Sequence, residues 1–165
     1  MKPQASPSSS RSGEAAAVAR EVIELLEVLW ERGRDAVPVA PVSASQLRVL
    51  YSLEREEGIN LRTLGEILGS SPPSASRLCD RLEALGFVAR TPSPVSRREL
   101  MLHLTTRGEA YLRELRARRE EVLRSVIERM SRTSQSELRS GLAAFRGAVE
   151  QNSLVRGAGQ ADRTA

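Results

Sequence analysis

Basic and small polar side chains share one side of the segment SSPPSASRLCDRLEALG, residues 70–86. At 100° per residue, its apolar positions form a single helical stripe, made of Ala75, Leu78, Leu82 and Leu85. The other side and the first turn carry the candidate contact residues Ser71, Pro73, Ser74, Ser76, Arg77 and Arg81. The planar guanidinium of arginine can bond two acceptors of a phosphate or of a guanine edge at once. Small residues let the protein backbone approach the floor of a DNA groove. This pattern predicts a helix that binds double-stranded DNA.

Four further arginines near this helix are candidate DNA contacts: Arg62, Arg90, Arg97 and Arg98. From the first to the last of them there are six arginines against three acidic residues, a net charge of +3. Arg81 has an alternative interpretation as the ion-pair partner of Asp80 or Glu83. For Arg90, the alternative to a phosphate contact is a structural ion pair. For the other arginines the alternative is a solvated charged surface.

Arginine is also unusually frequent in the chain as a whole. Of the 25 basic residues in 165, 24 are arginine and one is lysine, and the formal net charge is +4. A GC-rich genome explains the amount, because arginine codons are GC-rich. The functional interpretation therefore depends on position. The first predicted helix, with five acids against two arginines, is not the DNA-binding face.

The sequence offers little that catalysis or metal binding needs. It has one histidine, His103, and one cysteine, Cys79, and it shows no phosphate loop, paired histidine and acid, or nucleophile motif. We therefore expect no enzyme activity, no metal site and no cofactor. The chain also lacks an apolar run of membrane-spanning length and a signal-peptide pattern. We expect a cytoplasmic protein that does not bind membranes.

The elements that must position these side chains form a winged helix-turn-helix order. A capping box opens a helix at Ser43, a short helix follows Asn60, and the helix over 70–86 comes next. The hydrophobic period then changes to that of a two-stranded hairpin, the wing. The lobe covers about 43–105, and the second helix of such a motif enters the major groove.

Longer helices flank this lobe and make the predicted fold mainly α. Apolar stripes predict helices over about Glu14–Arg32 and Thr105–Met130, and a last helix that opens with a capping box from Ser134 to Glu137. The first and last expose more apolar surface than the lobe could cover, so we expect a twofold-symmetric dimer to bury it. The expected layout is a disordered tail (1–13), one domain (14–152) with dimerisation helices at about 14–33 and 106–152, and a second disordered tail (153–165).

Three stretches carry a family resemblance: LRTLGEILGSSPPSASRLCDRLEALGFVAR (61–90), SRRELMLHLT (96–105) and TRGEAYL (106–112). With Leu104, Thr105 and Gly108 at their characteristic spacing, the span from about 14 to 152 resembles the MarR family of bacterial transcription regulators. The resemblance implies a homodimer, a palindromic operator and a wing arginine in the minor groove. Arg97 or Arg98 matches that arginine, and Ser96 stands where the family usually has aspartate.

The resemblance also implies a small aromatic or phenolic effector, bound between the dimer body and the winged lobe. Trp30 and Tyr51 are the candidate ligand contacts, with core or dimer packing as the alternative. Cys79 is interpreted as a small buried hydrophobe, since no basic residue on its helix face would lower its pKa. The alternative is a redox switch, as in family members that sense peroxide.

Together these patterns predict a homodimeric, sequence-specific DNA-binding regulator, a repressor that a small ligand releases. Two alternatives stand beside it. One is a winged-helix module that docks another protein and has no operator of its own. The other is a cysteine-based redox-responsive regulator.

Overall fold

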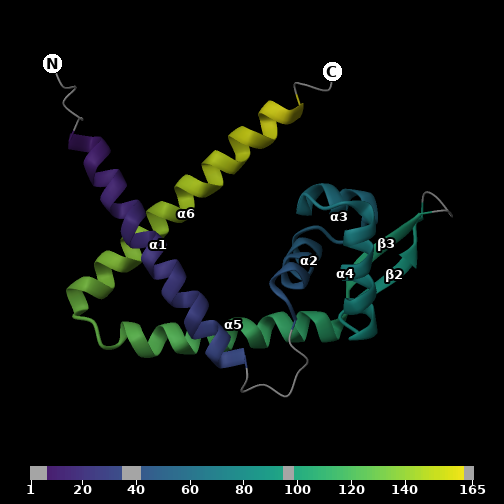
Figure 1. The fold of residues 1–165 in the computed structure, drawn as a ribbon, viewed down its shortest axis with the longest axis horizontal. Coiled ribbons are helices and arrows are strands. Elements are labelled where there is room, and N and C mark those ends of the chain that lie inside the picture. Colours follow the sequence, from purple (N-terminus) through teal and green to yellow (C-terminus); the bar gives the residue numbers. More distant parts are fainter. Residues whose placement is uncertain (1–6, 35–41, 95–98, 162–165) are drawn as a thin grey trace. The chain divides into compact units, whose positions relative to one another are not determined.

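The fold of the chain is taken from a computed structural model that describes residues 7–34, 42–94 and 99–161 (Figure 1). Two compact units divide the chain, one up to Leu115 and the other from Arg116 onward. The first unit holds the predicted DNA-binding lobe. Across the described segments, no helix combines the length and apolarity that a bilayer crossing requires.

Three helices make the body of the lobe: α2 (Ala44–Arg55), α3 (Leu61–Leu68) and α4 (Pro72–Ala84). The capping box predicted at the start of α2 is present, with Ser43 and Gln46 each satisfying a backbone amide of the other. The Asn60 side chain caps α3, and Gly69 ends it in the left-handed conformation at φ 61°. The α3–α4 connection is therefore the tight turn that a helix-turn-helix needs.

Gly65, in the middle of α3, permits that turn to close. A Cβ at this position would lie 3.2 Å from the backbone oxygen of Ser70, in the turn itself. The amide of Ser70 donates to the oxygen of Gly65 over 2.9 Å, so the glycine is explained by the return of the chain on itself.

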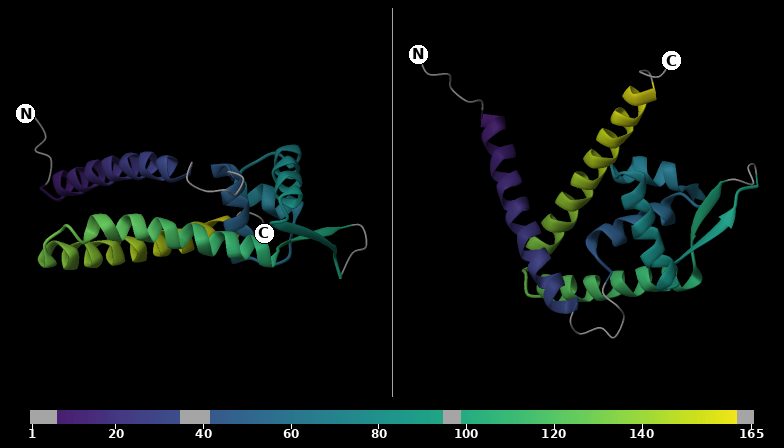
Figure 2. Two further views of the ribbon diagram at one scale, coloured as in Figure 1. Left: turned by 90° about the horizontal axis from the view of Figure 1, so that it is seen from below. Right: turned by 45° about the vertical axis from the view of Figure 1, so that its right-hand side comes forward.

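A small antiparallel sheet follows in the order β1-β3-β2, with β1 at Ile59–Asn60, β2 at Val88–Pro92 and β3 at Leu100–Leu104. The predicted hairpin is the β2–β3 pair, in which Val88 faces Leu104 and Pro92 faces Leu100. Figure 2 shows this hairpin extending away from the helices of the lobe. The short strand β1, which the sequence pattern did not predict, pairs with β3 through Ile59 and Leu102.

One hydrophobic core joins the three helices to the sheet. Its largest fully buried side chains are Phe87, Leu50, Leu53, Leu64, Leu82, Leu102 and Leu112. Each apolar side chain buried in this way contributes about 1.5–3 kcal/mol to folding. Because Leu82 lies on α4 and Leu102 on β3, the core fixes both the DNA-facing helix and the wing strands.

The first turn of α5 (Thr106–Ile127) is anchored to the end of α4. The hydroxyl of Thr105 donates to the oxygen of Gly86 over 2.6 Å and accepts from the amide of Gly108 over 3.0 Å. The Phe87 ring stacks on Tyr111, with centroids 4.8 Å apart. The guanidinium carbon of Arg107 lies over the Phe87 ring, 5.4 Å from its centroid. The two Thr105 bonds explain the threonine and glycine spacing found in the sequence.

The flanking helices depart from their predicted bounds. Helix α1 is Pro7–Arg34 and α6 is Arg132–Ala161, so both run into segments predicted as disordered tails. Pro7 suits the first turn of a helix, and no proline interrupts the chain between residues 132 and 161. Helix α5 ends at Ile127 instead of Met130.

The start of α6 also differs from the predicted capping box at Ser134. The helix begins three residues earlier, where the hydroxyl of Ser131 accepts from the amide of Ser134 over 3.1 Å. Gln135, inside the first turn, donates to the oxygens of Ile127 and Met130 at the end of the preceding segment. These bonds satisfy backbone groups at the end of α5 and at the start of α6.

Candidate nucleic-acid interface

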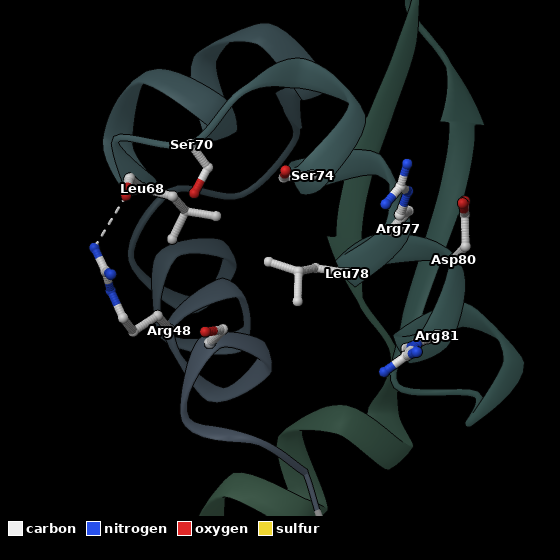
Figure 3. A pocket seen from close by; sticks show the side chains of 9 residues that line it. Arg48, Leu68, Ser70, Ser74, Arg77, Leu78, Asp80 and Arg81 are labelled. Atoms are coloured by element: carbon white, nitrogen blue, oxygen red, sulfur yellow. Dashed lines mark hydrogen bonds between the residues drawn. The ribbon is translucent and has the colours of Figure 1, made fainter.

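An open groove of about 580 Å³ lies between α2 and α4 in the lobe, with the α3–α4 turn at one end (Figure 3). Its lining residues are Ser45, Arg48, Leu68, Ser70, Ser74, Arg77, Leu78, Asp80 and Arg81. Three of these, Ser74, Arg77 and Arg81, are candidate DNA contacts predicted from the sequence. A fourth, Asp80, was considered there as an ion-pair partner of Arg81. The structure therefore gathers the arginines of α4 at one concave surface.

Arg77 and Arg81 are the basic residues of the α4 wall. Both are exposed, and within the described segments neither makes an ion pair or a side-chain hydrogen bond. In Figure 3 the two guanidinium groups lie along one side of the groove, one helical turn apart. A guanidinium without a partner keeps all its donors for a ligand such as a phosphate or a base edge.

The first turn of α4 presents small groups. Ser71 is the N-cap residue, but its hydroxyl donates to the hydroxyl of Ser74 over 3.0 Å and makes no side-chain cap bond. Pro73 is exposed and Ser76 is half-buried. The backbone of this turn is therefore open to close approach by a ligand.

Arg90, on β2, is held in an ion-pair network with α4. Its two terminal nitrogens lie 2.6 Å from an oxygen of Asp80 and 2.6 Å from an oxygen of Glu83, and its side chain is only 24% exposed. The hydrogen bond to Asp80 raises the pKa of Arg90 further above its ordinary value. Of the two interpretations of Arg90 in the sequence, the structure favours the ion pair. The same contacts show that these two acids pair with Arg90, not with Arg81.

Comparison with known proteins gives the family. The family model described as MarR family matches residues 40–99. The transcriptional repressor MprA of Escherichia coli is 30% identical over 112 residues, which are 67% of this chain and 64% of MprA. An HTH-type transcriptional regulator of Mycobacterium bovis is 29% identical over 70% of this chain and 80% of its own length.

The resemblance of this chain to the MarR family is thereby confirmed in sequence and in fold. The comparisons support a DNA-binding transcription regulator of the winged-helix class. The crystal structure of RV1404 from Mycobacterium tuberculosis, 26% identical, superposes with a TM-score of 0.69 over 89% of this chain and 97% of that one. The predicted winged helix-turn-helix fold is thereby confirmed.

The other predicted DNA contacts lie away from the groove or outside the described residues. Arg62 is 85% exposed at the start of α3, 3.5 Å from Glu66 one turn later. It does not line the groove, so its phosphate contact stays a prediction. Arg97, Arg98 and Ser96 lie outside the described residues, and the choice of wing arginine is untested.

The two candidate effector contacts, Trp30 and Tyr51, lie on α1 and α2. Tyr51 packs against the buried core of the lobe, and Trp30 is half-buried on α1. Neither lines the groove between α2 and α4. A role for them in ligand binding stays a prediction.

Sequence reasoning missed the α2 wall of the groove. Ser45 and Arg48 line it, together with Ser70 from the turn. The signal was available, because Ser45 and Arg48 are three residues apart on a helix whose buried positions are Gln46, Val49, Leu50 and Leu53. What the sequence does not contain is the pairing of that outward face with α4.

Cys79 is a buried core residue, as the sequence analysis favoured. Its side chain is fully buried, and this burial, reinforced by the nearby carboxylates of Asp80 and Glu83, raises the pKa of Cys79 to about 11 against the opposing effect of Arg90. The thiol is therefore protonated at neutral pH, whereas a redox-sensing cysteine needs an accessible thiolate. Below about pH 8.5 the thiol is protonated in both the folded and the unfolded chain, so the free energy of unfolding does not depend on its titration. As the pH rises from there toward 11, the unfolded chain loses the proton first, and the folded state loses stability.

We expect Cys79 to resist thiol reagents in the folded protein. At pH 8 a disulfide reagent such as DTNB should label the native chain at least about tenfold more slowly than the chain unfolded in guanidinium, because only the thiolate reacts. The measurement is the absorbance of the released thiol over time. Equal rates in the two states would contradict the buried, protonated thiol and revive the redox switch.

Proposed function

We propose that this chain is a homodimeric, sequence-specific repressor whose α4 reads the major groove of a palindromic operator. The observation that carries the proposal is the pair Arg77 and Arg81, exposed and without partners in the described segments, on the outward face of α4. Small residues at the start of the same helix suit close approach to bases. MprA, the Escherichia coli relative, is named as a transcriptional repressor, which supports the direction of control.

Exposed apolar side chains outside the lobe support the homodimer. Among the described residues, α1 exposes Val18, Val22, Ile23, Leu25, Val28 and Leu29, and α6 exposes Leu142, Phe145 and Val149. Stripes of this size are unusual on a monomer and mark interaction surfaces. A twofold partner that covers them would set two α4 helices about one DNA turn apart, roughly 34–36 Å.

We also infer that a small aromatic molecule relieves repression and that the protein acts in the cytoplasm, where the DNA is. A ligand that binds the dimer only in a DNA-incompetent spacing of its lobes would lower the operator-bound population. A thermal-shift screen of phenolic compounds, with and without operator DNA, tests this. A compound that stabilises the free protein should stabilise the DNA complex less.

Replacement of Arg77 tests the α4 contact. We expect Arg77→Ala to weaken binding to the DNA upstream of the protein's own gene by roughly tenfold, the lower end of the loss for one base-edge contact. Gel-shift titration measures the dissociation constant. Arg113→Ala, which removes an exposed arginine of α5 outside the groove, is the matched control and should stay within about twofold of wild type.

Two outcomes would count against this proposal. If Arg77→Ala binds as tightly as wild type, α4 does not make the proposed contact. If the unchanged protein binds this DNA no better than a scrambled duplex, it lacks sequence specificity, and the alternative of a protein-docking module becomes the better interpretation.

A further inference from the structure

Arg48 lies on α2, on the opposite wall of the groove from the α4 arginines, and in Figure 3 its side chain extends away from α4 toward Leu68. One of its terminal nitrogens donates to the backbone oxygen of Leu68 over 3.2 Å. That oxygen belongs to the last turn of α3, where unpaired carbonyls and the helix dipole favour a cation. The bond fixes the guanidinium at the groove edge while the side chain stays exposed.

The charges of the groove favour an anion. Its charged lining residues are Arg48, Arg77 and Arg81 against Asp80. The Asp80 carboxylate is already paired with Arg90 over 2.6 Å, so it does not neutralise the three arginines. Between the walls lie the apolar side chains of Leu68 and Leu78, which contribute no competing acceptor. Three cations therefore border one open surface.

We propose that Arg48 binds a phosphate of the DNA strand that borders the major groove occupied by α4. The inference rests on the proposed function, since it assumes that α4 enters that groove. A guanidinium has five N–H donors and Leu68 uses one, so donors remain for a phosphate oxygen. Because Arg48 is on α2, across the groove from the base-reading side chains, it meets the backbone. It adds affinity without sequence information.

This assignment separates two kinds of arginine in one interface. Arg77 is expected to discriminate between sequences, and Arg48 to strengthen binding to every duplex equally. Each phosphate neutralised by an arginine contributes about 0.9 to the slope of log affinity against log salt concentration. Loss of Arg48 should therefore lower that slope by about 0.9.

The test compares Arg48→Gln with Arg48→Lys in the full-length protein. Glutamine keeps an N–H donor for Leu68 but loses the charge, and lysine keeps the charge. Arg55→Gln, two turns further along α2 and outside the groove, is the matched control. Fluorescence anisotropy is measured from 50 to 300 mM salt on the upstream duplex and on a scrambled duplex of equal composition. Melting temperatures confirm that all variants are folded.

We expect Arg48→Gln to weaken binding to both duplexes by the same factor, roughly three- to tenfold at 100 mM salt, with the slope lowered by about 0.9. Arg48→Lys and Arg55→Gln should keep the wild-type slope. An unchanged slope in Arg48→Gln overturns the inference and leaves the proposed function standing. So does a loss equal in the Gln and Lys variants, which would indicate a purely structural bond. Failure of the wild type to prefer its upstream duplex instead overturns the proposed function.

Discussion

Gly108→Ala should destabilise the lobe by about 3 kcal/mol, the upper part of the range for overpacking in a rigid site. A Cβ at Gly108 would overlap the backbone oxygen of Phe87 and lie 3.2 Å from a methyl carbon of Leu104. This loss corresponds to more than a hundredfold change in the folding equilibrium, since about 1.4 kcal/mol is a factor of ten. Urea unfolding followed by circular dichroism measures it.

The overlap cannot be relieved by moving a flexible side chain. The oxygen of Phe87 accepts from the amide of Thr105 over 3.0 Å, and Thr105 is itself bonded to Gly86 and Gly108. Any shift of α5 away from Phe87 therefore breaks the bonds that join α5 to the end of α4. Such a shift would also separate Phe87 from Tyr111, whose stacked rings are 4.8 Å apart.

Gly147→Ala is the matched control for this substitution. Gly147 is also inside a helix, but nothing lies within 4 Å of the position that its Cβ would take. Alanine there should stabilise the protein by up to about 1 kcal/mol through helix propensity. If both substitutions have the same effect, the close approach of α5 to Phe87 is not a tight constraint.

Arg90→Ala should weaken DNA binding by about 30-fold, or about 2 kcal/mol, without Arg90 touching DNA. Its removal leaves the carboxylates of Asp80 and Glu83 without their cation on α4, beside the proposed DNA contacts. Both carboxylates are partly exposed, at 55% and 41%, so they would repel approaching phosphates. Arg90 is in this view a positioning residue that neutralises α4 and ties it to β2.

A double-mutant comparison separates this role from direct phosphate contact. In the background Asp80→Asn with Glu83→Gln, the further change Arg90→Ala should cost less than about threefold in affinity. Direct contact with DNA would instead make Arg90→Ala equally costly in both backgrounds, because independent effects add. Gel-shift titrations on the upstream duplex supply all four dissociation constants, and melting curves show that each variant is folded.

Local sequence determined much of the lobe. The capping box at Ser43, the Asn60 cap and the left-handed Gly69 involve residues within a few positions of one another, so their chemistry can be read along the chain. The stripe of Ala75 and Leu82 placed the outward face of α4 in the same way, because one helical period relates all its positions. The prediction erred where helices end, at α1, α5 and α6, since no strong stop signal stands there.

What the sequence alone determined about this protein is the order of its elements and the face on which α4 carries arginines. Only the tertiary structure decided which arginines are available to a ligand. Arg90 and Arg81 read alike in the sequence, yet the β2 strand brings Arg90 against Asp80 and Glu83 and leaves Arg81 without a partner in the described segments. Arg48 joined the groove because α2 packs beside α4. Charge pairing acts over a few ångströms between residues far apart in the chain, so it appears only when the core has brought those elements together.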